Sequence, residues 1–253
     1  MTWALDLDGV VWLAGQGLAG SAEAVAALRE AGERVVFLTN NSGPTVAEQL
    51  GALARVGIDA APEDVTTSSQ AAASTLTSGQ RAAVVGDKGV LEAMAARGVE
   101  VVPATSGPEA VVVGRTVDLD YWALSACAQA VRAGARFVAT NGDSTFPTGS
   151  GLLPGAGALV AFVKTASGKE PVIAGKPHEA MASLVQERYG PIAVMVGDRP
   201  DTDGLFAKLL GARFGLVLSG VTGASDLPVQ PEPDMVGPDL AGLVAAHTAP
   251  DRR

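Results

Sequence analysis

Short apolar runs that alternate with helix-like stretches constrain the fold of this chain more than any other feature. Each run ends in polar or small residues, and the runs lie at residues 3–5, 34–38, 192–196 and 213–217. An Ala-rich stretch at 21–31, with Ser21 as its expected N-cap, follows the first run, and a further helix is expected at 45–56. Apolar strands alternating with helices are typical of parallel βαβ units. The sequence therefore predicts an α/β fold with a doubly wound parallel sheet.

A second strand–helix series lies between residues 78 and 168. Its expected strands and helices are 82–85, 90–97, 110–113, 120–133 and 137–140. This series lacks the acidic strand ends of the outer segments. We expect residues 78–168 to form a separate α/β module, inserted into a discontinuous core domain of residues 1–77 and 169–253.

Composition narrows the classes of function. The 253-residue chain has a net charge of −9 and no basic block, which argues against nucleic-acid binding and against attraction to anionic membranes. The apolar stretch at 151–163 is too short to span a bilayer and contains Pro154. Cys127 is the only cysteine, so no internal disulfide can form. With no basic leader at the start, we expect a cytoplasmic protein.

Two carboxylates, Asp6 and Asp8, follow the first apolar run. Side chains two residues apart in an extended strand point the same way, with Cα atoms about 6.5–7 Å apart. One carboxylate can then attack as a nucleophile while the other exchanges a proton with the leaving oxygen. Gly9 permits a sharp turn and a close approach of backbone N–H groups to an anion. The alternative is a plain strand that ends in an Asp-Gly turn.

Residues 39–42, Thr-Asn-Asn-Ser, follow the second run and offer hydroxyl and amide donors of the kind that a phosphate needs. A helix that begins near Pro44 would add its N-terminal dipole. The alternative is that Thr39 or Ser42 only caps that helix.

Lys176 lies in a loop before a helix that we expect Pro177 to open in its first turn. Its point charge can neutralise a phosphoryl oxygen, whereas the alternative is an ordinary surface lysine. His178 is expected to be a partner of the helix start, with a substrate contact as the alternative.

The turn after the third run, at 197–203, is rich in aspartate. Asp198 and Asp6 form a set of oxygen ligands of the type that Mg²⁺ prefers. Asp203 is expected to hold a metal-bound water or Lys176. The alternative, a polar turn with Asp caps, suits Asp201 better than Asp198.

These elements, in this order and with an insertion between the second and third, resemble the haloacid dehalogenase superfamily. Within it the chain is most similar to the NagD and para-nitrophenylphosphatase branch of phosphatases, which carry a large α/β cap. The resemblance covers nearly the whole chain. The matching segments are residues 5–10, 38–42, 139–143, 146–147, 153–158, 175–177 and 197–199 with 202–203.

The resemblance implies a Rossmann-like core with an inserted α/β cap, and a phosphatase that uses Mg²⁺. Asp6 would form an aspartyl-phosphate, and Asp8 would protonate the leaving alcohol and later activate water. A dehalogenase has no use for a proton donor at Asp8, so dehalogenation is rejected. A phosphotransferase or mutase that uses the same aspartyl-phosphate stays an alternative. A catalytically silent binding module would have lost a core carboxylate or the lysine, and none is missing.

The resemblance also implies the remaining site residues. Thr39, Asn40 and Lys176 would hold the phosphoryl oxygens. The implied metal ligands are Asp6, the backbone carbonyl of Asp8, and Asp198, with Asp203 in support.

Substrate choice in this branch comes from the cap, where Asn141, Asp143 and Thr145 are the candidates to face the site. A large cap excludes water and bulk, which favours a small phosphorylated metabolite. Glycerol phosphate, phosphoglycolate, sugar phosphates, nucleoside monophosphates and pyridoxal phosphate are the candidates. A homodimer through the cap is implied as well.

Two positions depart from the family pattern. Gly204 replaces the usual aliphatic residue after the Thr-Asp pair, which predicts looser packing behind Asp203. Arg115 and Thr116 follow Gly114 where an acidic residue is expected, and we expect Arg115 to be an exposed structural arginine rather than a substrate contact.

Overall fold

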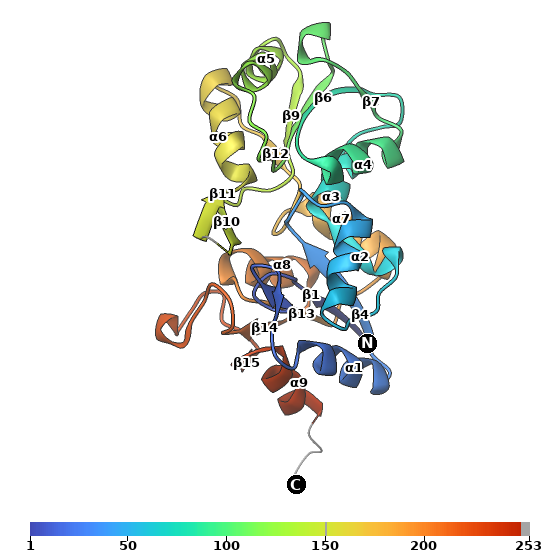
Figure 1. Cartoon of the computed structure of the whole chain (residues 1–253), viewed down its shortest axis with the longest axis vertical. Coiled ribbons are helices and arrows are strands. Elements are labelled where there is room, and N and C mark those ends of the chain that lie inside the picture. The colour runs from blue at the N-terminus through green and yellow to red at the C-terminus, as the bar shows by residue number, and fades with distance from the viewer. Residues whose placement is uncertain (150, 249–253) are drawn as a thin grey trace. The chain divides into compact units, whose positions relative to one another are not determined.

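The computed structural model describes residues 1–149 and 151–248, and the chain divides into two compact units (Figure 1). The first unit comprises Met1–Thr39, Leu50–Thr66 and Val185–Arg253, and the second comprises Asn40–Gln49 and Thr67–Leu184. Each unit contains its own sheet, so the predicted α/β class with inserted α/β structure is confirmed.

The first unit is built on a six-stranded sheet with the order β15-β14-β13-β1-β4-β5. Its strands are β1 (Thr2–Leu5), β4 (Arg34–Thr39), β5 (Val65–Thr67), β13 (Val194–Gly197), β14 (Arg213–Val217) and β15 (Met235–Gly237). Strand β1 pairs in parallel with both β4 and β13, and Leu5 lies between Phe37 and Val196. Parallel strands bring their carboxyl ends to one edge, so the residues that follow β1 and β13 lie side by side.

Helices and turns complete the first unit. Helix α1 (Ser21–Glu30) packs against α9 (Leu240–Thr248), and α8 (Leu205–Leu210) packs against β13 and β14. Helices α2 (Val46–Arg55) and α7 (Glu179–Tyr189) contribute residues to both units. The remaining short elements are the strands β2 (Trp12–Leu13) and β3 (Gln16–Gly17) and helical turns at Pro62–Asp64, Pro200–Gly204 and Ala224–Asp226.

The predicted N-cap of the first helix is wrong. Gly20 is the N-cap of α1 and has a left-handed backbone with φ 79°. The Ser21 hydroxyl is buried and donates to the carbonyl oxygens of Val11 (3.1 Å) and Leu18 (2.9 Å). The serine hydroxyl therefore serves as a hydrogen-bond donor to carbonyl groups of the loop before the helix. Gly20 provides the left-handed conformation with which the helix begins.

The second unit is built on a five-stranded sheet with the order β12-β9-β8-β6-β7, whose strand pairs are parallel. Its elements are α3 (Ser68–Ser74), β6 (Arg81–Val85), α4 (Lys88–Arg97), β7 (Glu100–Val101), a turn at Ala104–Ser106, β8 (Ala110–Val113), α5 (Tyr121–Arg132), β9 (Arg136–Ala139), β10 (Thr145–Thr148), β11 (Gly151–Pro154), α6 (Ala156–Ser167) and β12 (Val172–Ile173). Strands β10 and β11 pair as an antiparallel hairpin.

Helices α5 and α6 lie together on one side of this sheet (Figure 1), and they enclose an apolar core that includes Val131, Phe137 and Val163. Burial in this core raises the pKa of the Cys127 thiol to about 11. Small and branched side chains fill the core, as the shortage of aromatic residues requires.

The predicted domain limits stay a prediction. Strand β12 at Val172–Ile173 pairs with β9 in the second sheet although it lies outside the predicted insertion of residues 78–168. Among the residues that the structure describes, no helix is both long and apolar enough to cross a bilayer.

Candidate active site

Asp6 and Asp8 lie at the carboxyl end of β1 in the first unit. The Asp6 N–H donates to the Val196 carbonyl (2.9 Å), which continues the pairing of β1 with β13 by one residue. The carbonyl of Leu7 accepts N–H groups from Val11 (2.9 Å) and Trp12 (3.2 Å), and this closes a tight turn around Gly9 at φ 82°. The turn holds the two aspartates at the sheet edge, where the sequence predicts them.

Trp12 is a contact that the sequence analysis missed. Its indole Nε1–H donates to Oδ1 of Asp8 at 3.2 Å. Since Trp12 is four residues away and belongs to β2, the short strands after the turn orient the Asp8 carboxylate. An aromatic residue soon after the Asp-Gly turn was the only indication in the sequence.

Asp198 and Asp203 join Asp6 in one buried cluster of carboxylates. One carboxylate oxygen from each of the three residues lies within 4.8 Å of the other two. Their exposed fractions are 9% for Asp6, 3% for Asp198 and 1% for Asp203. Buried groups of like charge at this separation are unfavourable unless a cation or protons compensate them. The donor set, all oxygen and all anionic, fits a hard divalent cation such as Mg²⁺.

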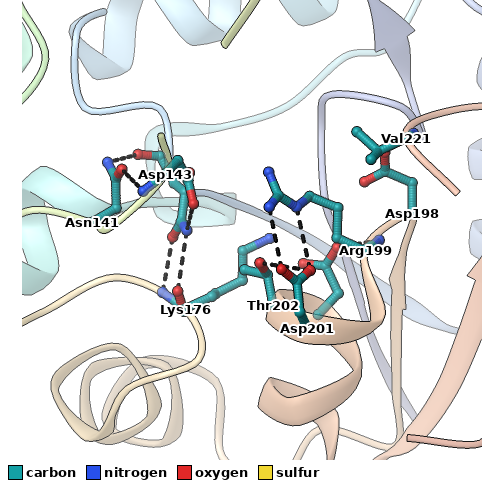
Figure 2. A network of polar contacts seen from close by, with 10 residues as sticks. Asn141, Asp143, Lys176, Asp198, Arg199, Asp201, Thr202 and Val221 are labelled. Carbon is teal, nitrogen blue, oxygen red and sulfur yellow. Dashed lines mark hydrogen bonds and ion pairs between the residues drawn. The ribbon is translucent and has the colours of Figure 1, made fainter. Parts of the chain in front are cut away.

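Main-chain N–H groups hold these carboxylates. The Val221 N–H donates to Oδ2 of Asp198 at 2.6 Å, and Figure 2 shows the carboxylate turned toward Val221. The Arg199 N–H donates to Oδ2 of Asp203 at 3.2 Å. Val221 follows β14 and was not among the predicted site residues. A main-chain donor leaves no mark in the sequence, because any residue except proline provides one.

Asp201 differs from its two neighbours. Its carboxylate is 72% exposed and forms an ion pair with Arg199 at 3.4 Å (Figure 2). It lies on the helical turn at Pro200–Gly204 and outside the buried cluster of Asp6, Asp198 and Asp203. The interpretation of Asp201 as a residue of a polar turn therefore suits its surroundings.

The expectation of loose packing at Gly204 is wrong. A Cβ atom at Gly204 would lie 2.8 Å from Cγ of Pro231 and 2.9 Å from Cε1 of Phe214. Gly204 itself is buried. The neighbouring rings occupy the space that an aliphatic side chain would take, so Asp203 has tightly packed residues behind it.

Thr39 and Asn40 are consecutive, but Thr39 ends β4 in the first unit whereas Asn40 belongs to the second. Thr39 is buried, with 1% of its surface exposed. The loop after it does not cap α2. Thr45 does, because its Oγ1 accepts from Glu48 N–H (3.1 Å) while Glu48 Oε2 accepts from Thr45 N–H (2.9 Å). The capping role considered for Thr39 and Ser42 is therefore wrong.

Lys176 and Asn40 are bound to each other in the second unit. The Asn40 Oδ1 accepts the Lys176 N–H at 2.8 Å, and the Asn40 Nδ2 donates to the Lys176 carbonyl at 3.1 Å and to Asp143 Oδ1 at 3.3 Å. Figure 2 shows Asp143 and Lys176 in this network. A Cβ at Gly175 would lie 2.6 Å from Asn40 Oδ1, so the glycine permits this approach. Asn40 thus fixes the main chain of Lys176, which is 3% exposed.

Asn141 fixes the same loop from the other side. Its Nδ2 donates to the Asn40 carbonyl at 2.6 Å, and its Oδ1 accepts the Asp143 N–H at 3.0 Å. Asn141 is 2% exposed, whereas Thr145 is exposed on β10. The structure therefore brings Asn141, Asp143, Asn40 and Lys176 together within the second unit.

Pro177 does not open the helix, contrary to the prediction. Helix α7 begins at Glu179, and the Ala182 N–H donates to the His178 carbonyl at 3.2 Å. The His178 N–H donates back to the Gly175 carbonyl at 3.0 Å, so a turn at 175–178 precedes the helix. His178 is therefore the main-chain partner of the first helical turn, and burial lowers the pKa of its imidazole.

The expectation of an exposed Arg115 is wrong. Its side chain is 17% exposed, and Nη2 lies 3.3 Å from Oδ2 of Asp87. The guanidinium lies 4.6 Å from the centre of the Phe146 ring, and a Cβ at Gly43 would lie 2.0 Å from Nη2. Arg115 thus connects the hairpin of β10 and β11 to the loop that follows Asn40. Its exposure depends on this packing between distant segments.

Comparisons with known proteins show the family to which the chain belongs. Residues 3–100 match the family of haloacid dehalogenase-like hydrolases, and residues 173–243 match a second family model of the same kind of hydrolase. The D-glycerol 3-phosphate phosphatase of Mycobacterium tuberculosis is 38% identical over 94% of this chain and 69% of its own.

Solved structures show the same fold. The glycerol phosphate phosphatase of Mycobacterium tuberculosis, in complex with magnesium, has a TM-score of 0.89 at 37% identity and covers 96% of this chain and 75% of that one. NagD from Escherichia coli has a TM-score of 0.85 at 30% identity and covers 95% and 96%. The chain therefore belongs to the haloacid dehalogenase-like hydrolases, in the branch that includes NagD and the p-nitrophenyl phosphatases.

Proposed function

We propose that this protein is a Mg²⁺-dependent phosphatase that hydrolyses a small phosphate monoester through an aspartyl-phosphate on Asp6. That it is a hydrolase of phosphoric monoesters follows from its family and from the phosphatases in its branch. The metal, the intermediate and the residue roles are the proposal. The observation that carries them is the buried cluster of Asp6, Asp198 and Asp203 at the sheet edge beside Asp8.

Asp6 is the proposed nucleophile and Asp8 the proposed acid and base. An oxygen of Asp6 attacks phosphorus, the bond from phosphorus to the ester oxygen breaks, and Asp8 gives its proton to the departing alkoxide. In the second step Asp8 takes a proton from water, which attacks phosphorus and releases phosphate and the Asp6 carboxylate. The Trp12 indole N–H supports this role, because it holds Asp8 in one orientation.

Asp6, Asp198 and the main-chain carbonyl of Asp8 are the proposed Mg²⁺ ligands, and Asp203 supports them. A bound Mg²⁺ would supply Lewis acidity that lowers the repulsion between the Asp6 carboxylate and an anionic phosphate. The N–H groups of Val221 and Arg199 keep the carboxylates of Asp198 and Asp203 in place. Such fixed donors reduce the rearrangement that metal binding requires.

Thr39, Asn40 and Lys176 are proposed to bind the phosphoryl oxygens. Phosphoryl transfer depends on positioning and on charge neutralisation, and a lysine ammonium and a threonine hydroxyl provide both. For Asn40 we propose the main-chain N–H, since its side-chain amide is bound to the main chain of Lys176. That contact supports Asn40 as the residue that keeps Lys176 in position.

We propose a small metabolite ester as substrate, of the glycerol phosphate, phosphoglycolate, sugar phosphate or nucleoside monophosphate type. The 38% identity to a D-glycerol 3-phosphate phosphatase supports a three-carbon ester first. Asp143 and Thr145 are the proposed substrate contacts. Asn141 belongs to the same set, and its amide also orders the loop of Asn40.

A homodimer through the second unit and a cytoplasmic location complete the proposal. Exposed apolar side chains gather before and at the start of α5, where Val117, Leu119 and Tyr121 precede Trp122, which is 77% exposed. Light scattering of the protein and of Trp122→Glu tests the dimer. A dimer mass that falls to the monomer mass in Trp122→Glu supports it, and a wild-type monomer contradicts it.

The test of the function is phosphate release from a panel of esters, with Mg²⁺ and with EDTA. Asp6→Asn is the inactive comparison, and Asp201→Asn is the matched control because Asp201 is exposed and paired with Arg199. We expect Mg²⁺-dependent release that Asp6→Asn abolishes and Asp201→Asn preserves. Release that Asp6→Asn retains, or that EDTA leaves unchanged, contradicts the proposal. Appearance of a phosphorylated acceptor alcohol in place of phosphate would favour the phosphotransferase alternative.

A further inference from the structure

The loop at residues 219–221, here called the Gly220 loop, follows β14 in the first unit and contacts Asp198. We propose that the Gly220 loop is the element that positions Asp198 and thereby sets the Mg²⁺ affinity of the site. The inference rests on the proposed function, since it takes Asp198 as a metal ligand. It assigns a role to residues outside the motifs that define the site.

The first observation is the contact between Val221 and Asp198. The Val221 N–H donates to Oδ2 at 2.6 Å, a short distance that is typical of a hydrogen bond to a charged acceptor. The next N–H along the chain, that of Thr222, donates to the Asp198 carbonyl at 3.3 Å. The loop therefore holds both the side chain and the main chain of Asp198.

The second observation is that two glycines enclose the carboxylate. A Cβ at Gly220 would lie 2.0 Å from Oδ2 of Asp198, and a Cβ at Gly9 would lie 2.4 Å from the same atom. A methyl group at position 220 would therefore displace the carboxylate. Asp198 is only 3% exposed, so its short side chain has little room to move aside.

The third observation connects the loop to the first aspartates. The Ser219 hydroxyl donates to the Gly9 carbonyl at 2.7 Å. Gly9 directly follows Asp8, whose carbonyl is a proposed metal ligand. The loop therefore fixes the separation between the turn that carries Asp8 and the carboxylate of Asp198.

These contacts fix the orientation of the Asp198 carboxylate. Because Oδ2 accepts the Val221 N–H, Oδ1 is the oxygen that Asp198 would offer to a bound Mg²⁺. Mg²⁺ demands near-ideal octahedral geometry with short bonds to single oxygens, so a carboxylate fixed in this way favours it. Displacement of the carboxylate would weaken Mg²⁺ binding while the sheet stays intact.

The experiment is a calorimetric titration of the whole protein with MgCl₂ in the absence of substrate. Gly220→Ala is the test variant, and Gly223→Ala is the matched control in the same segment. A Cβ at Gly223 meets its nearest atom, Oδ2 of Asp226, only at 3.6 Å. We expect Gly220→Ala to raise the Kd for Mg²⁺ at least tenfold and Gly223→Ala to leave it within twofold. A Kd in Gly220→Ala equal to that of the wild type overturns the inference alone.

A second pair of variants answers the question if Gly220→Ala does not fold. Val221→Pro removes the N–H donor, whereas Val221→Ala keeps it. Because Val221 is 68% exposed, loss of its side chain in either variant should disturb the packing little. We expect weaker Mg²⁺ binding only in Val221→Pro. Equal affinities in the two variants overturn the inference. Absence of Mg²⁺ binding in the wild type overturns the proposed metal site and the inference together, which separates the two failures.

Discussion

The two units of the molecule hold their polar residues in different ways. In the first unit, main-chain N–H groups fix Asp198 and Asp203, and glycine backbones lie against them. In the second unit, side chains hold the polar residues in place. The Asn40 amide binds the main chain of Lys176, and the Arg115 guanidinium lies against Phe146.

The two kinds of contact depend on residue identity to different degrees. Main-chain contacts follow from strand and turn geometry, so substitutions elsewhere leave them in place. Side-chain contacts change with the residues that form them. We infer that the main-chain contacts of the first unit tolerate substitution of nearby residues better than the side-chain contacts of the second unit.

The largest expected effect is in the first unit. Asp8→Asn removes the proposed proton donor and base while it keeps the size of the side chain. Loss of general acid and base catalysis should lower kcat by about a thousandfold, given typical contributions of 10²–10⁴. Steady-state kinetics on para-nitrophenyl phosphate and on an alkyl phosphate measure it. The loss should be smaller for para-nitrophenyl phosphate, whose leaving group needs less help from an acid. Equal activity of Asp8→Asn and wild type on both esters would remove Asp8 from the mechanism.

The next largest effect is a loss of stability when the packing around Gly204 in the first unit is disturbed. Gly204→Ala places a methyl group 2.8 Å from Pro231 and 2.9 Å from Phe214, so the free energy of unfolding should fall by about 1–3 kcal/mol. Gly51→Ala on α2 is the control, because its Cβ would meet only Arg55 Nη1 at 3.7 Å, and it should stabilise by about 0.4–1 kcal/mol. Urea denaturation measures both variants. Stabilisation by Gly204→Ala would show that the site behind Asp203 is loosely packed.

A smaller change in the free energy of unfolding is expected for substitutions of Arg115 in the second unit. Arg115→Ala removes the contact with Phe146 and the ion pair with Asp87, and should lower the free energy of unfolding by about 1 kcal/mol. Arg115→Lys keeps the charge beside Asp87 but loses the planar group on the Phe146 ring, so it should restore only part of the loss. Thermal melting of the three proteins measures this order. Full restoration by lysine would show that stacking contributes nothing.

The smallest effect is a dependence of stability on pH. Burial lowers the pKa of His178 below its ordinary value of about 6.5, so the unfolded chain binds this proton more readily than the folded protein. Stability should therefore fall as the pH drops below about 6.5, until it passes the lowered pKa of the folded state. His178→Gln should lose this part of the decline. Melting temperatures at pH 5.5 and 7.5 check it, and an identical decline in both proteins would contradict it.

Sequence reasoning predicted β1, β4, β13 and β14 of the first sheet and β6, β8 and β9 of the second, but not the sheet strands β5, β15, β7 and β12. It placed Asp6, Asp8 and Asp198 at strand ends, because parallel strands bring their carboxyl ends to one edge. It missed the Gly220 loop, since the contact comes from a main-chain N–H that any residue could supply. It also misjudged Ser21 and Arg115. A glycine began the helix in the first case, and packing with a distant hairpin buried the side chain in the second.

The most direct test of the account is mass spectrometry of the protein after acid quenching during turnover. The Asp8→Asn variant is used, because a phosphorylated enzyme should accumulate when water is not activated. Para-nitrophenyl phosphate is the substrate, since its leaving group departs without a strong acid. We predict a phosphoryl group on Asp6, in the presence of Mg²⁺ and not in EDTA. A phosphoryl group on another residue would contradict the account, as would its absence during active turnover.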